Sequence, residues 1–326
     1  MKKIFIGLWV VAILLVINVT RHEQGSIIIY SSLEQYRGEE LQNQLNEEFP
    51  DENILVMYLP TAKSAAKIMV EGDNTDADIV VGLESSYMDK IQGSLADLSG
   101  IETPAYVEGF ATEDNDNQYI TWEKQAGSFV INTDVMERHN LPIPTTYDEL
   151  LDPMYKGVIA MPDPKSSGTG YFFYKSLVNE RGTEEALAYI DELAKNVKAF
   201  TESGSGPIKL LIQEEIGVGL ALTFQAVEQI NAGSPFEIIF PEEGSPYSLT
   251  ATGLIKGRED NELIQEVFHY ITNDFLIYDK AHFSPETILV DQEIAMENYP
   301  ENIKYADMEG IKEIEEKERL LKLWKY

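Results

Sequence analysis

The sequence predicts an α/β protein that is built from two lobes. From residue 26 onward, short runs of β-branched residues alternate with stretches of helical periodicity, which is typical of parallel sheets covered by helices. The chain has 326 residues, more than a single hydrophobic core usually holds, so we expect two cores. The β-rich stretch at residues 119–133 is longer than a strand within one lobe needs, and it predicts a crossing between the lobes.

The first lobe is predicted to begin with three strands that alternate with helices. The strands are residues 26–32 (SIIIYSS), 53–59 (NILVMYL) and 77–83 (ADIVVGL). Ser31 and Glu34 have the spacing of a capping box, which would open a helix that runs to about Phe49. Residues 61–72 predict a second helix closed by Gly72, and a third helix begins near Glu84.

The second lobe follows the crossing at residues 119–133. Its predicted elements are a capping box of Thr146 and Glu149, a strand at 157–161, a helix at 182–196 and a strand at 216–224, with the stretch 197–215 before this last strand. Residues 235–257 are β-rich and would cross back, and the acidic helical tail from about Glu262 is expected to pack on the first lobe.

These patterns predict three parts of the chain. Residues 1–25 form an export signal or a membrane anchor, residues 26–123 and 237–326 form lobe 1, and residues 124–236 form lobe 2. Two short crossings between the lobes suit a hinge that closes on a ligand.

The composition excludes several classes of function. The formal net charge is −31, from 56 acidic and 25 basic residues, and it would repel nucleic acid. A solvated, soluble exterior explains most of these carboxylates. The chain has no cysteine, which excludes disulfides, thiolate metal sites, a cysteine nucleophile and a lipid-modified N-terminal cysteine.

The N-terminus has the features of an export signal. Lys2 and Lys3 precede an apolar run at residues 4–19, and Arg21 is the one basic residue close behind it. The following residues show no small-x-small cleavage pattern, and 16 apolar residues are slightly fewer than a membrane span needs. A cleaved signal and an uncleaved anchor both remain open.

Four strand-to-helix junctions combine hydroxyl side chains with glycine. They lie at residues 30–32, 82–86, 166–170 and 203–206. Helix starts expose N–H groups that bind anions, and glycine lets an oxyanion approach the backbone closely. A plain N-cap explains any one of these junctions. Residues 166–169, however, supply three hydroxyls where a cap needs one, so the four junctions together predict an anion-binding cleft.

Catalytic motifs are weak. Ser64 and Lys67 have the spacing of the nucleophile motif of penicillin-binding enzymes, but the sequence has neither a Ser-Asp-Asn nor a Lys-Thr-Gly partner. A serine hydrolase is kept as an alternative. The sequence contains no P-loop, no dinucleotide-binding motif and no metal-ligand spacing among its four histidines. We therefore expect no enzymatic activity, no catalytic residue, no metal and no cofactor.

The chain resembles the bacterial extracellular solute-binding proteins of the type II periplasmic-binding fold. The similarity lies in the branch that includes ferric-iron, 2-aminoethylphosphonate and sugar-phosphate binders. The most specific segment is residues 144–173 (PTTYDELLDPMYKGVIAMPDPKSSGTGYFF), and further segments are 27–33, 77–85, 129–136, 202–226 and 238–257. The resemblance implies an exported protein that closes two lobes on a small ligand and delivers it to an ABC permease. We expect it to be a monomer.

The resemblance and the junctions together give the candidate ligand-binding residues: Ser31, Ser32, Glu84, Ser85, Ser166, Ser167, Gly168, Thr169, Ser203, Ser205, Phe224, Gln225, Glu243 and Tyr247. The Ser-Gly-Thr segment stands where family members hold a phosphate, a phosphonate or a synergistic anion. Glu84 or Glu243 could face an ammonium group of the ligand.

The chain departs from the ferric-binding members at two places. These members have a pair of adjacent tyrosines after the strand that corresponds to residues 216–223, where residues 223–226 (TFQA) of this chain offer no phenolate. They often also have a histidine shortly after the first strand, where this chain has Glu34. Iron prefers hard anionic oxygen ligands, so this loss disfavours direct ferric binding. The expected ligand is an organic anion, most simply a phosphonate or a phosphate ester such as 2-aminoethylphosphonate. A chelated iron, a thiamine-like or polyamine-like cation, and a role as an anchored sensor are the alternatives.

Overall fold

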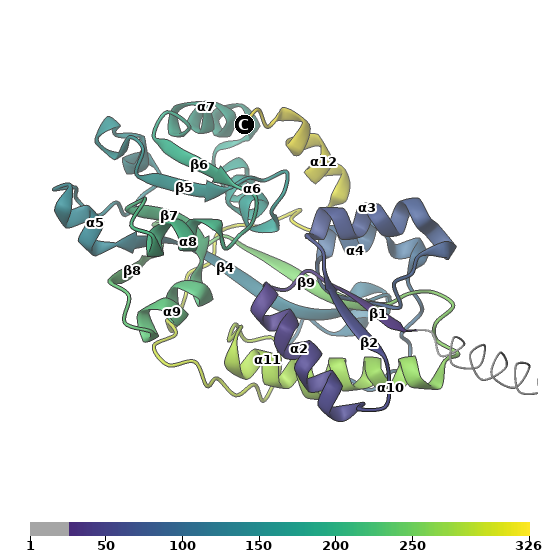
Figure 1. Cartoon of the computed structure of the whole chain (residues 1–326). Coiled ribbons are helices and arrows are strands. Elements are labelled where there is room, and N and C mark those ends of the chain that lie inside the picture. The colour runs from purple at the N-terminus through teal and green to yellow at the C-terminus, as the bar shows by residue number, and fades with distance from the viewer. Residues whose placement is uncertain (1–25) are drawn as a thin grey trace, which may run out of the picture.

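The computed structural model describes residues 26–326, so the predicted export signal or anchor at residues 1–25 lies outside the described residues. The strands of this part form one mixed sheet in the order β2-β1-β3-β9-β4-β7-β5-β6, with β8 paired to β4. Figure 1 shows that this sheet runs through two halves, each covered by helices. In residues 26–326, no helix has both the length and the apolar character that crossing a membrane requires.

The first half contains the parallel strands β2, β1 and β3 and the antiparallel strand β9. Helices α2 and α10 cover one face of it, and helices α3 and α4 cover the other. The bounds are β1 (Ile27–Ser31), α2 (Gln35–Glu48), β2 (Ile54–Tyr58), α3 (Thr61–Glu71), β3 (Ile79–Glu84), α4 (Ser85–Lys90), β9 (Tyr247–Leu254) and α10 (Glu262–Tyr270). The three predicted strands are confirmed, and α3 ends at Gly72 as predicted.

One predicted capping box is absent and the other is present. Ser31 belongs to β1, and Glu34 precedes α2 without making a side-chain cap; its carboxylate lies 2.7 Å from the Arg37 guanidinium instead. The prediction at this place was wrong because α2 begins only at Gln35, so Glu34 rather than Ser31 occupies the N-cap position. The Glu149 carboxylate accepts the Thr146 N–H at 3.2 Å, and the Thr146 hydroxyl accepts the Glu149 N–H at 3.3 Å.

The second half is formed by the C-terminal part of β4 with β7, β5 and β6. Strands β7, β5 and β6 run parallel to one another, and β4 pairs with β7 and β8 in antiparallel fashion. The bounds are α5 (Thr133–Arg138), β5 (Ile159–Pro162), α6 (Gly168–Arg181), α7 (Thr183–Leu193), β6 (Val197–Thr201), α8 (Gly206–Ile212), β7 (Val218–Leu222), α9 (Thr223–Asn231) and β8 (Phe236–Ile239).

Strand β4 (Ile120–Asn132) crosses from one half to the other, as the long β-rich stretch predicts. Residues 120–126 pair with β9 of the first half, and residues 127–131 pair with β7 of the second half. Strand β9 returns alongside β4. The two strands therefore run side by side from one half to the other in Figure 1.

The C-terminal tail divides between the two halves, which differs from the expectation that all of it packs on the first lobe. Helix α10, the π-helical turn at Ile271–Phe275 and α11 (Leu276–His282) contribute Phe268, Phe275 and Leu276, respectively, to the core of the first half. Leu320 of α12 (Ile314–Leu323) and Trp324 pack with Tyr174 in the core of the second half. Residues 283–313 thus make a third passage between the halves. The predicted lobe boundaries stay a prediction.

Candidate functional site

A cleft of about 380 Å³ lies between the two halves, over the crossing strands β4 and β9. Its walls are the starts of helices and the loops that precede them. Nine of the candidate residues line it, namely Ser32, Glu84, Ser166, Ser167, Gly168, Thr169, Ser203, Ser205 and Gln225. All four junctions singled out in the sequence therefore send at least one residue to the same cleft.

The Ser-Gly-Thr turn opens α6 at the cleft wall. The Ser167 hydroxyl caps the helix by accepting the Gly170 N–H at 3.4 Å. The N–H groups of Gly168 and Thr169 and the Thr169 hydroxyl have no hydrogen-bond partner within residues 26–326. Donors at the N-terminus of a 14-residue helix also carry the positive end of its dipole. This wall is therefore supplied with unused donors for an anion.

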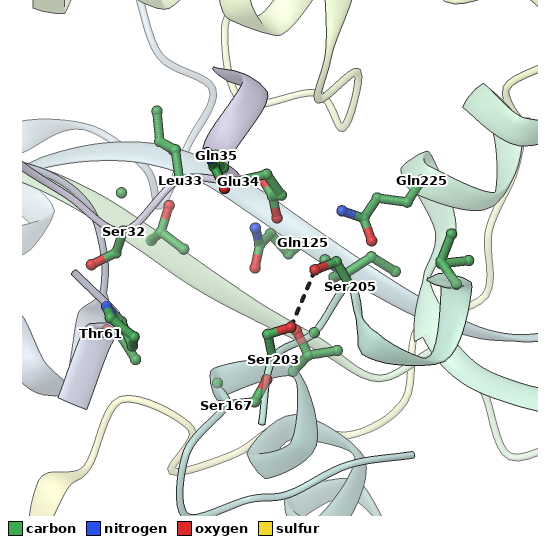
Figure 2. A pocket seen from close by; sticks show the side chains of 18 of the residues that line it. Ser32, Leu33, Glu34, Gln35, Thr61, Gln125, Ser167, Ser203, Ser205 and Gln225 are labelled. Atoms are coloured by element: carbon green, nitrogen blue, oxygen red, sulfur yellow. Dashed lines mark hydrogen bonds between the residues drawn. The ribbon is translucent and has the colours of Figure 1, made fainter. Parts of the chain in front are cut away.

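A second hydroxyl turn lies directly against the first. The Ser203 and Ser205 hydroxyl oxygens are 3.2 Å apart, and Figure 2 shows both near Ser167. Between them, Gly204 lies so close to α6 that an added Cβ would stand 2.3 Å from the Thr169 hydroxyl oxygen. Only glycine lets the two turns pack this closely. Together they form one surface of hydroxyl and N–H donors, and Lys209 also lines the cleft near it.

Carboxylate and amide groups form a facing surface that was not predicted as a site. Glu34, Gln125 and Glu228 line the cleft, and Figure 2 shows Glu34 and Gln125 across from Ser167 and Ser203. The Tyr36 hydroxyl donates to both Glu228 carboxylate oxygens, at 3.0 and 3.1 Å. This bond joins α2 of the first half to α9 of the second half at the rim of the cleft. Glu228 lies one helical turn after the candidate residue Gln225 on α9. This spacing was the one sequence signal that could have placed Glu228 at the cleft.

A buried ionic network lies beneath this surface. The Arg37 guanidinium binds Glu34 at 2.7 Å, Glu123 at 2.7 Å and Asp279 at 2.6 Å. Lys280 lies 3.1 Å from Asp279 and 3.5 Å from Glu123. These contacts fix Glu34 at the cleft, because its carboxylate is held by a guanidinium that has no freedom to move.

The buried ionic network, taken together with Glu228, contains more acidic than basic side chains. Four carboxylates, on Glu34, Glu123, Asp279 and Glu228, stand against two cations, on Arg37 and Lys280. Burial raises the pKa of Glu34 despite Arg37. Burial also acts to raise the pKa of Glu123, but the attraction of Arg37 and Lys280 outweighs it and lowers this pKa to about 2.

The same excess of negative charge acts on the Glu228 carboxylate. Burial raises its pKa to about 7, and the nearby charge of Glu34 adds to this. A positively charged or donor-rich ligand group between Glu34 and Glu228 would relieve the excess.

Comparison with known families identifies the class of protein. The family model described as bacterial extracellular solute-binding protein matches residues 74–302, which is more than half of the chain. The chain belongs to this family. The resemblance seen in the sequence is thereby confirmed, and this solute-binding protein binds a small solute outside the cytoplasm as part of an ABC importer.

Other proteins share the sequence or the fold over most of the chain. An uncharacterized protein from Haemophilus influenzae is 25% identical over 252 residues, which is 74% of this chain and 71% of that protein. The periplasmic binding protein P5PA has a TM-score of 0.79 and 22% identity over 92% of this chain and 98% of its own. AfuA from Actinobacillus pleuropneumoniae, solved with fructose 6-phosphate, has a TM-score of 0.75 and 22% identity over 92% of this chain and 97% of its own.

These likenesses confirm the α/β, type II periplasmic-binding fold of the solute-binding protein. Among residues 26–326, no group of three or more His, Asp or Glu side chains is arranged to hold a metal ion.

Three of the predicted ligand residues of this solute-binding protein face the protein interior. The Ser31 hydroxyl is buried in β1 and has no partner within residues 26–326. The Ser85 hydroxyl donates to the Leu249 carbonyl at 3.0 Å. Phe224 is 2% exposed, and the Arg37 guanidinium lies 5.6 Å from its ring centre.

Glu243 and Tyr247 also lie outside the cleft. Glu243 is 3.6 Å from the Arg181 guanidinium, on a separate small cavity. Tyr247 is the first residue of β9, and the Lys124 ammonium lies 4.4 Å from the centre of its ring. Side chains alternate along a strand, so Lys124 and Gln125 point to opposite faces of β4, and only Gln125 lines the cleft.

Glu84 lines the cleft but already has a cation. Its carboxylate accepts from the Lys317 ammonium and from the Ser86 hydroxyl, the latter at 2.8 Å. Both Glu84 and Lys317 are buried. Lys317 balances the charge of Glu84, and Arg181 stands beside Glu243, whereas Glu34 and Glu228 belong to a group with two more carboxylates than cations. The role of Glu84 or Glu243 opposite a ligand ammonium stays a prediction that their surroundings do not favour.

Proposed function

We propose that this solute-binding protein captures a small organic solute that carries a phosphonate or phosphate-ester group. The observation that carries the proposal is the set of unused donors on Gly168 and Thr169, next to the Ser203 and Ser205 hydroxyls. Hydrogen bonds from N–H and O–H groups to an oxyanion are stronger than those to a neutral acceptor. A tetrahedral phosphoryl group presents several oxygens at once and so can use donors from both turns.

The other end of the ligand lies against Glu34, Gln125 and Glu228 in this proposal. Two carboxylates with raised pKa values favour a group that donates hydrogen bonds or carries positive charge. An ammonium group satisfies both conditions, and sugar hydroxyls satisfy the first. The ligand therefore has an acceptor-rich phosphoryl end and a donor-rich end, as 2-aminoethylphosphonate has. We transfer the expected ammonium contact from Glu84 and Glu243 to Glu34 and Glu228.

Binding and release follow from the position of the cleft between two halves. Closure around the ligand excludes water, which strengthens the hydrogen bonds at both ends. An ABC permease in the membrane would then accept the ligand from the open protein. The protein performs no chemistry in this scheme. We also propose that it acts as a monomer and that residues 1–25 direct its export, either as a cleaved signal or as a retained anchor.

A purely cationic ligand of the thiamine or polyamine type is the second candidate. Four carboxylates line the cleft, on Glu34, Glu84, Glu202 and Glu228, whereas Lys209 is the only lysine or arginine in its lining. This excess of acidic groups would attract a cation, but it leaves the donors at the start of α6 without a partner.

Titration calorimetry separates the candidates. The panel is 2-aminoethylphosphonate, inorganic phosphate, fructose 6-phosphate, ferric citrate and spermidine, each added to purified protein at pH 7. We expect 2-aminoethylphosphonate or fructose 6-phosphate to bind more tightly than inorganic phosphate, because they reach both ends of the cleft. Binding of spermidine alone would refute the phosphoryl proposal and favour the cation.

A further inference from the structure

Lys317 reaches from the C-terminal helix α12 to the wall of the cleft. Its ammonium contacts the Glu84 carboxylate and lies 3.1 Å from the Ser86 hydroxyl. The rings of Tyr87 and Tyr171 flank it, each with its centre 4.4 Å from the nitrogen. Tyr87 belongs to α4 of the first half and Tyr171 to α6 of the second half. Lys317 is thus enclosed by groups from both halves of the protein.

Glu84 lies directly beside the Ser-Gly-Thr turn. A Cβ added at Gly168 would stand 3.8 Å from a Glu84 carboxylate oxygen and 3.6 Å from its Cγ. The N–H groups of Gly168 and Thr169 are the donors to which the proposed function assigns the ligand's phosphoryl group. Any anion at this turn therefore has the Glu84 carboxylate as a close neighbour.

A lone carboxylate at this position would oppose anion binding. Two negative charges a few ångströms apart repel strongly where protein has replaced most of the water. Lys317 removes this repulsion. Burial lowers the pKa of Lys317, but the Lys317–Glu84 pair has no net charge whether the shared proton resides on the nitrogen or on the carboxylate.

We propose that Lys317 of the C-terminal helix is a specificity-determining residue, because it cancels the charge of Glu84 and so lets the Ser-Gly-Thr turn hold an anion. This inference rests on the proposed function, since it assumes a phosphoryl group at that turn. It assigns a ligand-selecting role to a helix that lies outside the sequence segments typical of the cleft.

Helix α12 holds Lys317 at this position from both halves. Leu320 and Trp324, the apolar residues that anchor α12, pack in the core of the second half. On the other side, Glu318 of α12 pairs with Lys90 of α4 in the first half, where Glu84 ends strand β3. Lys317 is therefore fixed beside both Glu84 and the Ser-Gly-Thr turn.

The test compares three variants with the wild type. Lys317→Met leaves Glu84 as an uncompensated carboxylate, and Glu84→Gln with Lys317→Met removes both charges at similar volume. Lys175→Met is the matched control, because Lys175 is also buried and contacts α12 through Glu316 at 2.7 Å, but it does not line the cleft. Calorimetry at pH 7 uses whichever of 2-aminoethylphosphonate and fructose 6-phosphate binds the wild type more tightly.

We expect Lys317→Met to weaken binding by at least about tenfold, the double variant to return to within about threefold of the wild type, and Lys175→Met to leave affinity unchanged. Thermal unfolding of each variant shows that it is folded. If the wild type binds and the single and double variants lose affinity equally, the charge argument is wrong while the proposed function stands. If the wild type binds neither compound, both are refuted.

Discussion

The bond between Tyr36 and Glu228 gives a prediction about pH. It closes the rim of the cleft between α2 and α9, and the carboxylate is partly buried near Glu34. Replacing Glu228 with Gln keeps the size and an oxygen that can accept from Tyr36, but it removes the charge. The wild type and Glu228→Gln therefore differ in stability by an amount that depends on pH.

The size of this difference follows from the pKa of Glu228. Burial raises it from an ordinary 4.5 to about 7. The raised pKa means that the neutral carboxyl of Glu228 stabilises the folded protein relative to the charged carboxylate. This contribution is fully present below pH 4.5, where Glu228 is neutral in both the folded and the unfolded protein, and it is lost as the pH rises through about 7. The full shift would be worth about 3.4 kcal/mol. Because water reaches part of this side chain, we expect about 1 to 2 kcal/mol.

Urea unfolding at pH 5 and pH 8 measures the effect. We expect Glu228→Gln to gain about 1 to 2 kcal/mol relative to the wild type on going from pH 5 to pH 8. Glu47→Gln, which removes an exposed carboxylate on α2, controls for the loss of one charge from a highly acidic protein. A difference between wild type and Glu228→Gln that is the same at both pH values would refute the reasoning.

Three further predictions concern the cleft and the network beneath it. Thr169→Val, which removes a hydroxyl at nearly constant volume, should weaken binding of the phosphorylated ligand by about 1.5 to 3 kcal/mol in calorimetry, and unchanged affinity would mean that the turn is only a helix cap. Gly204→Ala places a Cβ 2.3 Å from the Thr169 hydroxyl oxygen and should weaken ligand binding by at least about tenfold. The control Gly93→Ala has open space around the added Cβ and should leave binding unchanged. Equal effects of the two variants would show that the close packing of the turns does not matter for binding. Arg37→Met leaves Glu123 and its neighbours as buried, uncompensated carboxylates and should lower the free energy of unfolding by about 3 to 5 kcal/mol in urea, and a loss below 1 kcal/mol would contradict the network.

Local sequence pattern predicted the elements and the anion-facing turns. Alternation of β-branched runs with helical periodicity marks each strand of the first half, and the surplus of hydroxyls at residues 166–169 marks the start of α6 at the cleft. These signals are local, because a helix start and its capping residues are neighbours in the chain. The length of the stretch at 119–133 predicted the crossing strand for the same reason.

Contacts between distant residues could not be predicted in this way. Glu84 and Lys317 are 233 positions apart, and Tyr36 and Glu228 are 192 apart. Their partners depend on how the two halves meet, which no single motif encodes. The amphipathic pattern of α12 shows that one of its faces is buried but not in which core, so its helix was expected on the first lobe. No sequence motif showed that Lys317 would contact Glu84, or that Arg181 would lie near Glu243.

A crystal structure of the protein with 2-aminoethylphosphonate or fructose 6-phosphate tests the central claim most directly. The account predicts phosphoryl oxygens within hydrogen-bonding distance of the Gly168 and Thr169 N–H groups and the Thr169 hydroxyl, with the donor-rich end against Glu34 and Glu228. A ligand bound with its phosphoryl group away from the Ser-Gly-Thr turn would contradict it.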